Sequence, residues 1–132
     1  MSKTQLTAIA LLVHDYDEAV SWFCECLDFE LREDTPLGDG GKRWVVVGPK
    51  AGGAGLVLAK AKNTAERAAV GRQAPDRVWL FYDTDNFADE YERLRGRGVT
   101  FIETPRSEVY GQVVVFEDLY GNRWDLRQPA HR

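Results

Sequence analysis

The sequence predicts an α+β fold in which two βαβββ modules follow each other in one chain and together form a ligand cavity. Short apolar runs bounded by glycine and proline are typical of strands, and two longer segments show the apolar spacing of amphipathic helices. The order of strand, helix and three strands occurs twice, with about fifty residues in each copy. Two such sheets, each with a helix on one face, would enclose a cavity for a small ligand. Residues at matching places keep a constant offset: Asp15, Phe29 and Leu31 correspond to Asp85, Val99 and Phe101.

The first module covers about residues 6–60 and begins with an apolar run of strand length at 6–13. Asp15 follows as a helix N-cap, and Glu18 completes the capping-box pattern. Apolar side chains then recur with helical spacing as far as Leu27, which predicts one buried helix face. Three strands are predicted after this helix: 29–33, 42–48 and 55–60.

A short connecting helix is predicted at 63–71, because Asn63 can cap its start and Gly71 can end it. The second module, at about residues 77–128, repeats the pattern of the first, and residues 105–111 before its penultimate strand are predicted to form a loop. The chain of 132 residues is therefore expected to be one domain. The predicted elements of the second module are a strand at 77–83, a helix within 84–98 and strands at 99–103, 111–117 and 122–128.

The composition is that of a globular protein, with 44% hydrophobic and 29% charged residues and a net charge of −4. It does not indicate a basic surface for nucleic acid or anionic membranes, and no apolar stretch is long enough to cross a bilayer. Cys24 and Cys26 point in different directions on the predicted helix, so neither a disulfide nor a zinc site is expected. We therefore expect a cytoplasmic protein that binds neither nucleic acid nor membranes.

Two segments of the chain carry a resemblance to a known family. They are LLVHDYDEAVSWFCECLDFEL at 11–31 and VVVFEDLYGNRWDL at 113–126, and the βαβββ repeat accompanies them. Together they resemble the vicinal oxygen chelate superfamily, which includes glyoxalase I, bleomycin-resistance proteins, fosfomycin-resistance enzymes and extradiol dioxygenases. The resemblance extends from about Leu6 to Gln128, and the D-x-x-G-N turn is a fairly specific mark of it. It implies a concave ligand cavity and a homodimer but no particular reaction, because the family includes enzymes and binding proteins.

The resemblance also identifies the positions at which metal-using members of the family hold a divalent ion. In those members, four strand positions filled by His, Glu or Gln converge on the ion. His14 and His131, the two histidines of the chain, lie off the required strand face. A metal site needs several converging ligands, so we expect no metal and no other cofactor. The four positions here are Ala8, Val57, Val78 (or Trp79, if the strand shifts by one residue) and Asp125, and only the last of these side chains can bind a metal.

Asp125 is a carboxylate among apolar neighbours near the end of the chain. Strand alternation places Arg123 and Arg127 on its face of the sheet and turns Trp124 and Leu126 toward the core. Asp125 is then either paired with one of these arginines or able to accept a hydrogen bond from a ligand. Both interpretations remain open at the level of the sequence.

Aromatic residues supply the other candidate contacts. Trp44 and Trp79 lie on predicted strands, and each is either a core residue or, if it faces the cavity, a flat wall for an aromatic ligand. Tyr110 lies in the predicted loop beside a glycine, at the expected cavity mouth, while Arg106 and Glu108 suggest a solvated ion pair. The candidate ligand-binding residues are Trp44, Trp79, Tyr110, Arg123 and Asp125.

The sequence favours a metal-independent binding protein that sequesters a hydrophobic or aromatic small molecule as a homodimer. The alternative is an enzyme of the lyase or dioxygenase branch that lacks the usual metal ligands and uses Asp125 or Tyr110 as an acid or base. No nucleophile with an adjacent base can be argued from the residues, so the catalytic residues are unknown. The glycine runs at 38–41 and 51–55 do not follow a strand and open a helix, as phosphate-binding loops do.

Overall fold

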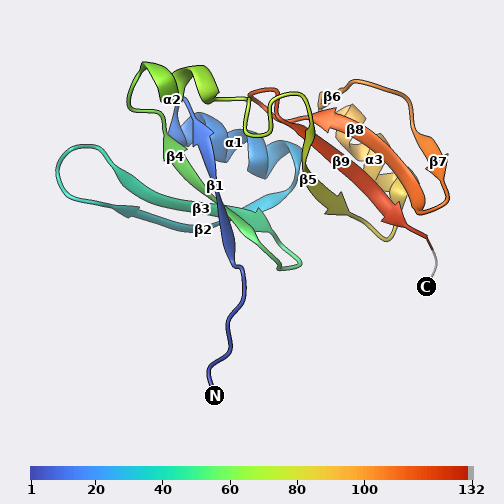
Figure 1. Ribbon diagram of the computed structural model, residues 1–132, viewed down its shortest axis with the longest axis horizontal. Coiled ribbons are helices and arrows are strands. Elements are labelled where there is room, and N and C mark those ends of the chain that lie inside the picture. The colour runs from blue at the N-terminus through green and yellow to red at the C-terminus, as the bar shows by residue number, and fades with distance from the viewer. Residues whose placement is uncertain (131–132) are drawn as a thin grey trace. The chain divides into compact units, whose positions relative to one another are not determined.

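The computed structural model describes residues 1–130, which lie in two compact units, Met1–Val70 and a second unit that begins at Gly71 (Figure 1). Each unit is a mixed β-sheet with one helix packed on one of its faces. The α+β architecture of two βαβββ-like modules is therefore confirmed. No helix among the described residues is long and apolar enough to cross a membrane.

Unit 1 has the strand order β1-β4-β3-β2, in which β1 runs parallel to β4 and the other pairs are antiparallel. The helix begins as predicted, because the Asp15 side chain accepts a hydrogen bond of 2.8 Å from the Glu18 backbone nitrogen. Asn63 caps the connecting helix in the same way. The elements are β1 (Ala8–Val13), α1 (Tyr16–Cys26), β2 (Phe29–Pro36), β3 (Arg43–Pro49), β4 (Gly55–Lys60) and α2 (Thr64–Ala69).

The two faces of the first sheet have different environments. On β1, Leu11 and Val13 are fully buried and face the core that α1 completes with Phe23. Leu12 lies between them and points to the opposite face, because side chains alternate along a strand. We call this opposite surface the open face of unit 1. It also carries Val46, Val57, Ala59 and Trp44 from β3 and β4.

Unit 2 has the strand order β5-β9-β8-β6, and a further short strand, β7, also pairs with β8. Its helix buries Phe87 and Leu94 as the helical spacing predicts. The sheet contributes Phe116, Trp124 and Leu126 to the same core, and all three are almost fully buried. The elements are β5 (Val78–Asp83), α3 (Phe87–Gly96), β6 (Thr100–Phe101), β7 (Arg106–Glu108), β8 (Gly111–Glu117) and β9 (Arg123–Pro129).

Three details of unit 2 differ from the sequence predictions. The loop predicted at 105–111 contains β7, whose residues gain backbone partners by pairing with β8. Asn86 caps α3, one position after the residue that corresponds to Asp15, so the repeat is shifted by one residue at the helix start. The pairing of β5 with β9 is irregular between Val78 and Leu80, which leaves Trp79 at a bulge.

The turn between β8 and β9 is the D-x-x-G-N segment. The buried Asp118 carboxylate accepts hydrogen bonds from the backbone nitrogens of Tyr120 and Asn122 and, at 3.0 Å, from the Trp124 indole nitrogen. Gly121 has a φ of 97°, a conformation that glycine adopts without strain. These bonds fix the strand that carries Asp125.

Candidate ligand-binding site

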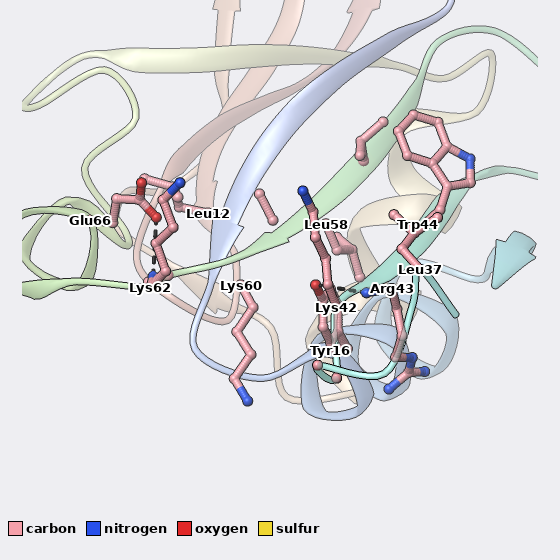
Figure 2. Close-up of a pocket in the computed structure, with 15 residues that line it drawn as sticks. Leu12, Tyr16, Leu37, Lys42, Arg43, Trp44, Leu58, Lys60, Lys62 and Glu66 are labelled. Atoms are coloured by element: carbon pink, nitrogen blue, oxygen red, sulfur yellow. Dashed lines mark hydrogen bonds between the residues drawn. The ribbon is translucent and has the colours of Figure 1, made fainter. Parts of the chain in front are cut away.

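A cleft of about 770 Å³ opens in unit 1 where β3 and β4 separate. The two strands are paired only at Val46 with Val57 and at Val47 with Leu56, and they are not paired along the rest of their length. Figure 2 shows the side chains that surround this space. The lining includes Leu12, Lys42, Trp44, Val57, Ala59 and Lys62.

Trp44 forms an aromatic wall of this cleft. The residue is 40% exposed, and its indole nitrogen donates a hydrogen bond of 3.0 Å to the Glu33 carboxylate on β2. This bond fixes the orientation of the ring without covering its face. Small apolar side chains, Val57 and Ala59, come from the neighbouring strand β4 and also line the cleft. Trp44, whose direction the sequence left open, thus lines a cleft of unit 1, and its contact with a ligand stays a prediction.

Arg43 lies beside Trp44, but its charge is already engaged. Its guanidinium group forms ion pairs with Asp34 at 2.7 Å and with Asp17 at 2.9 Å. It also lies over the Tyr16 ring, with 5.0 Å from Cζ to the ring centroid. The hydrogen bonds from Arg43 lower the pKa of the Asp34 carboxyl group, so both partners stay charged. Arg43 therefore shapes the end of the cleft rather than offering a free cation.

Asp125 lies on the face of the unit 2 sheet opposite α3. Its side chain is buried, with 9% of the residue exposed, and its Oδ1 atom has no hydrogen-bond partner within the described part of the chain. Burial raises the pKa of the Asp125 carboxyl group. Arg106 opposes this shift, Glu103 adds to it, and Arg127 opposes it more weakly. Asp125 is therefore a buried carboxyl group whose ionised form is only partly compensated.

The two arginines on the same face are bound elsewhere. Arg123 donates a hydrogen bond of 2.9 Å to the Asp76 carbonyl oxygen, and Arg127 pairs with Asp83 at 2.6 Å. Alternation placed them correctly beside Asp125, but neither donates a hydrogen bond to its Oδ1 atom. The structure therefore does not show the simple ion pair that was one interpretation of Asp125.

Trp79 and Tyr110 have different surroundings from Trp44. The Trp79 ring lies edge-on to Trp124 at 6.3 Å between centroids, so it packs with a core residue. Tyr110 is 49% exposed between β7 and β8. Hydrogen bonds with Tyr110, Glu108 and Glu103 raise the pKa of the Arg106 guanidinium group. The contact between Arg106 and Glu108 is the ion pair expected from the sequence. Of the two strand tryptophans, only Trp44 lines the cleft of unit 1.

The residues at the family's metal positions do not fit a metal ion. Ala8 and Val57 lie on the open face of unit 1 and Val78 lies on β5, and none of these side chains has a donor atom. Within residues 1–130, no three or more His, Cys, Asp or Glu side chains form a group that could hold a metal. His131 lies outside the described residues.

Comparison with known families agrees with this fold. The sequence model of the Glyoxalase/Bleomycin resistance protein/Dioxygenase superfamily matches residues 5–126. The chain belongs to this superfamily. A relative in this comparison, an uncharacterized protein of Shewanella frigidimarina, is 46% identical over 127 residues, which cover 96% of this chain and 94% of the relative.

Two solved structures, UcmS2 and TnmS3, are similar to this chain in both fold and sequence. UcmS2 is 29% identical with a TM-score of 0.80, and the match covers 96% of this chain and 98% of UcmS2. TnmS3, described as an antibiotic binding protein from a Streptomyces species, is 27% identical with a TM-score of 0.79. That match covers 98% of this chain and 99% of TnmS3.

The sequence analysis missed the charged residues of the cleft. Lys42 lies at the end of a glycine-rich loop and Lys62 in the connection between β4 and α2, where local patterns give no indication of a shared site. Glu33, which holds the Trp44 ring, was also missed, because its pairing depends on the register shift in β2 between Leu31 and Glu33. The superfamily resemblance pointed to a cavity but not to these residues.

Proposed function

We propose that this protein binds a small molecule with a planar aromatic or hydrophobic part, without a metal ion, in the cleft of unit 1. The observation that carries the proposal is the exposed Trp44 ring, held by Glu33 beside the small apolar side chains of β4. The cleft volume lies within the usual range for small-molecule sites, about 300–1,000 Å³. The likeness to TnmS3 supports a binding function but does not identify the ligand.

The proposal predicts that Trp44 contributes to binding more than to stability. We would titrate the protein with 2-naphthalenemethanol in a calorimeter and follow tryptophan fluorescence in parallel. Trp44→Ala should weaken binding about tenfold, the order expected from lost aromatic contact and buried area. Trp44→Phe is the matched control, because it keeps a ring in the cleft and should retain most of the affinity. Equal affinities in all three proteins would refute the site.

We keep four residues of unit 2 as further proposed ligand contacts: Trp79, Tyr110, Arg123 and Asp125. Asp125 offers an unpartnered acceptor, and Tyr110 offers an exposed ring and hydroxyl group. We also propose that the protein is a cytoplasmic homodimer that binds neither nucleic acid nor membranes. Native mass spectrometry of protein purified without added metal would report dimer, carried ligand and metal in one spectrum. A stoichiometric metal, lost in Asp125→Ala, would contradict the metal-independent proposal.

A metal-free enzyme is the second candidate function, and the raised pKa of Asp125 is the observation that favours it. A buried carboxyl group with a raised pKa keeps its proton to higher pH than a free carboxyl group, as a general acid requires. If a compound carried by the purified protein is released unchanged after incubation, the binding function stands. If it is converted, and Asp125→Asn stops the conversion without preventing binding, the enzyme function replaces it.

A further inference from the structure

We propose that the ligand of the unit 1 cleft carries an anionic group, which Lys42 recognises with help from Lys62. This inference rests on the proposed binding function and adds the charge of the ligand to it. The protein as a whole has a net charge of −4, yet the charged residues that line the cleft are all basic except Glu66. An anion would therefore be attracted to this place against the average charge of the molecule.

The basic residues around the cleft differ in whether their charge is already used. Arg43 is paired with Asp17 and Asp34, as described above. Lys42 and Lys62 form no ion pair within the described residues, so their ammonium groups are available to a ligand. Recognition of an anion would fall to these two lysines.

The carboxylates of Glu33, beside the Trp44 ring, and of Glu66, at the other end of the cleft, accept hydrogen bonds from donors of the protein. Glu33 accepts the indole hydrogen bond, and Glu66 accepts a hydrogen bond of 3.1 Å from the Lys62 backbone nitrogen, drawn as a dashed line in Figure 2. A cationic ligand in the cleft would have to compete with these donors and would lie near Lys42. The arrangement therefore discriminates against cations as well as favouring anions.

The local structure sets the position of Lys42. The Leu37 backbone nitrogen donates a hydrogen bond of 2.8 Å to the Lys42 carbonyl oxygen, which closes the glycine-rich loop between β2 and β3. Gly38 and Gly41 take positive φ angles of 78° and 84° in this loop, which allow the tight reversal. The loop thus returns the chain to the cleft with Lys42 directly before Arg43 and Trp44.

The lysine side chains around the cleft extend to different sides of the sheet (Figure 2). The side chains of Lys42 and Lys62 extend to the side of the sheet on which the Trp44 ring lies. The Lys60 side chain extends to the opposite side, as its place in β4 next to Ala59 requires. Lys60 has the same charge and also lines the cleft, but its side chain lies on the opposite side of the sheet, so it serves as a control for the direction of the Lys42 side chain.

Three probes with one ring system and different charges test the inference: 2-naphthoate, 2-naphthalenemethanol and 2-naphthylmethylammonium. Affinities would be measured by calorimetry at neutral pH, at low salt and at about 1 M salt, where the screening length is about 3 Å. We expect 2-naphthoate to bind about threefold to tenfold more tightly than the ammonium probe at low salt, and the preference to shrink at high salt.

Lys42→Glu should abolish or reverse this preference, whereas Lys60→Glu, with the same change in net charge, should leave most of it. The affinity for the neutral alcohol should change little in either variant, which also shows that the cleft is still folded. Equal binding of the two charged probes to the wild type would overturn the inference, and so would equal effects of Lys42→Glu and Lys60→Glu. Failure of all three probes to bind, or their indifference to Trp44→Ala, would instead overturn the proposed function.

Discussion

The two units share a topology but use the face opposite their helix differently. In unit 1, β3 and β4 pair at two positions and then separate, which leaves a cleft beside an exposed tryptophan. In unit 2, the corresponding strands β8 and β9 pair without interruption from Gly111–Pro129 to Glu117–Arg123. The length of the ladder between these two strands, rather than the fold, therefore decides whether this surface is open.

The two strand pairs are connected differently. In unit 2, the turn is short, and Asp118 binds its backbone and the Trp124 indole group, so the strands leave it in register. In unit 1, the longer connection carries Gly52 and Gly53 at positive φ, and the Arg32 guanidinium group donates hydrogen bonds of 2.9 Å to the Pro49 and Gly53 carbonyl oxygens. The ladder therefore forms next to this connection and ends on the side where the strands line the cleft.

The charged side chains of the two faces also differ, because within residues 1–130 those of unit 2 are paired and two of those around the cleft of unit 1 are not. The arginines on the face of unit 2 are bound to Asp83, Glu103, Glu108 and the Asp76 carbonyl oxygen. Around the cleft of unit 1, Lys42 and Lys62 have no such partners within the described residues. Paired charges contribute little net attraction for a ligand, whereas unpaired ones remain able to bind it. This difference supports the proposal that the ligand binds in unit 1.

The largest expected effect tests what the units have in common. Phe23 on α1 and Leu94 on α3 are both fully buried. Phe23→Ala and Leu94→Ala should each reduce the free energy of unfolding by about 2–5 kcal/mol, through lost burial and the cavity left behind. Urea unfolding followed by circular dichroism measures both losses.

Exposed positions on the same helices provide the controls. Ser21→Ala and Glu92→Ala should change the free energy of unfolding by no more than about 0.5 kcal/mol. A loss below this value for both Phe23→Ala and Leu94→Ala would mean that the two helices do not anchor their sheets. A single transition shifted equally by both buried substitutions would support the proposal that the units form one domain.

The next effect should be confined to unit 2. Asp118→Ala removes the acceptor of the Trp124 indole and of two backbone N–H groups and leaves buried donors unsatisfied. We expect a loss of about 2–4 kcal/mol, since each unsatisfied group costs about 1–3 kcal/mol and the costs do not add fully. Hydrogen exchange should show faster opening of β8 and β9 and unchanged protection of β3. Equal loss of protection in both units would contradict this assignment of the turn.

Much of the fold could be predicted from local patterns, because caps, turns and apolar spacing act within a few residues. Asp15 with Glu18, and the turn from Asp118 to Asn122, determine the places where elements begin and end. The strand β7 could not be predicted in this way. Its sequence, Arg106–Glu108, is polar and follows a proline, and it is extended because β8 offers it partners.

The site was harder to predict because it depends on register and on strand separation. The direction of Trp44 follows from its pairing with β2, and Trp79 lies at a bulge that a single shift in pairing creates. Arg123 and Arg127 were placed on the correct face by alternation, but their partners come from distant segments. Lys42 reaches the cleft from the loop between β2 and β3, whose closure by Leu37 no local pattern indicates.

The smallest expected effect separates two buried carboxyl groups of unit 2. Burial raises the pKa of both Asp118 and Asp125 above the usual 3.8. The Asp118 carboxylate is compensated by several donors, whereas the Asp125 Oδ1 atom has none within residues 1–130. The same substitution by Asn should therefore have opposite signs: Asp118→Asn destabilises the protein, and Asp125→Asn stabilises it by up to about 1 kcal/mol near neutral pH.

The pH dependence of the Asp125→Asn effect follows from the direction of the pKa shift. A carboxyl group with a raised pKa in the folded state holds its proton more tightly there than in the unfolded chain. The wild type therefore loses stability as the pH rises from about 3.8 through the raised pKa, while the Asn variant loses none at this position. The stability difference between the two proteins should be near zero in acid, grow over this range and stay constant above it. Unfolding curves of both proteins across this range measure it. A falling difference would show that Arg106 and Arg127 stabilise the ionised form of Asp125 more than burial and Glu103 destabilise it, and a constant difference would show that these opposing effects cancel.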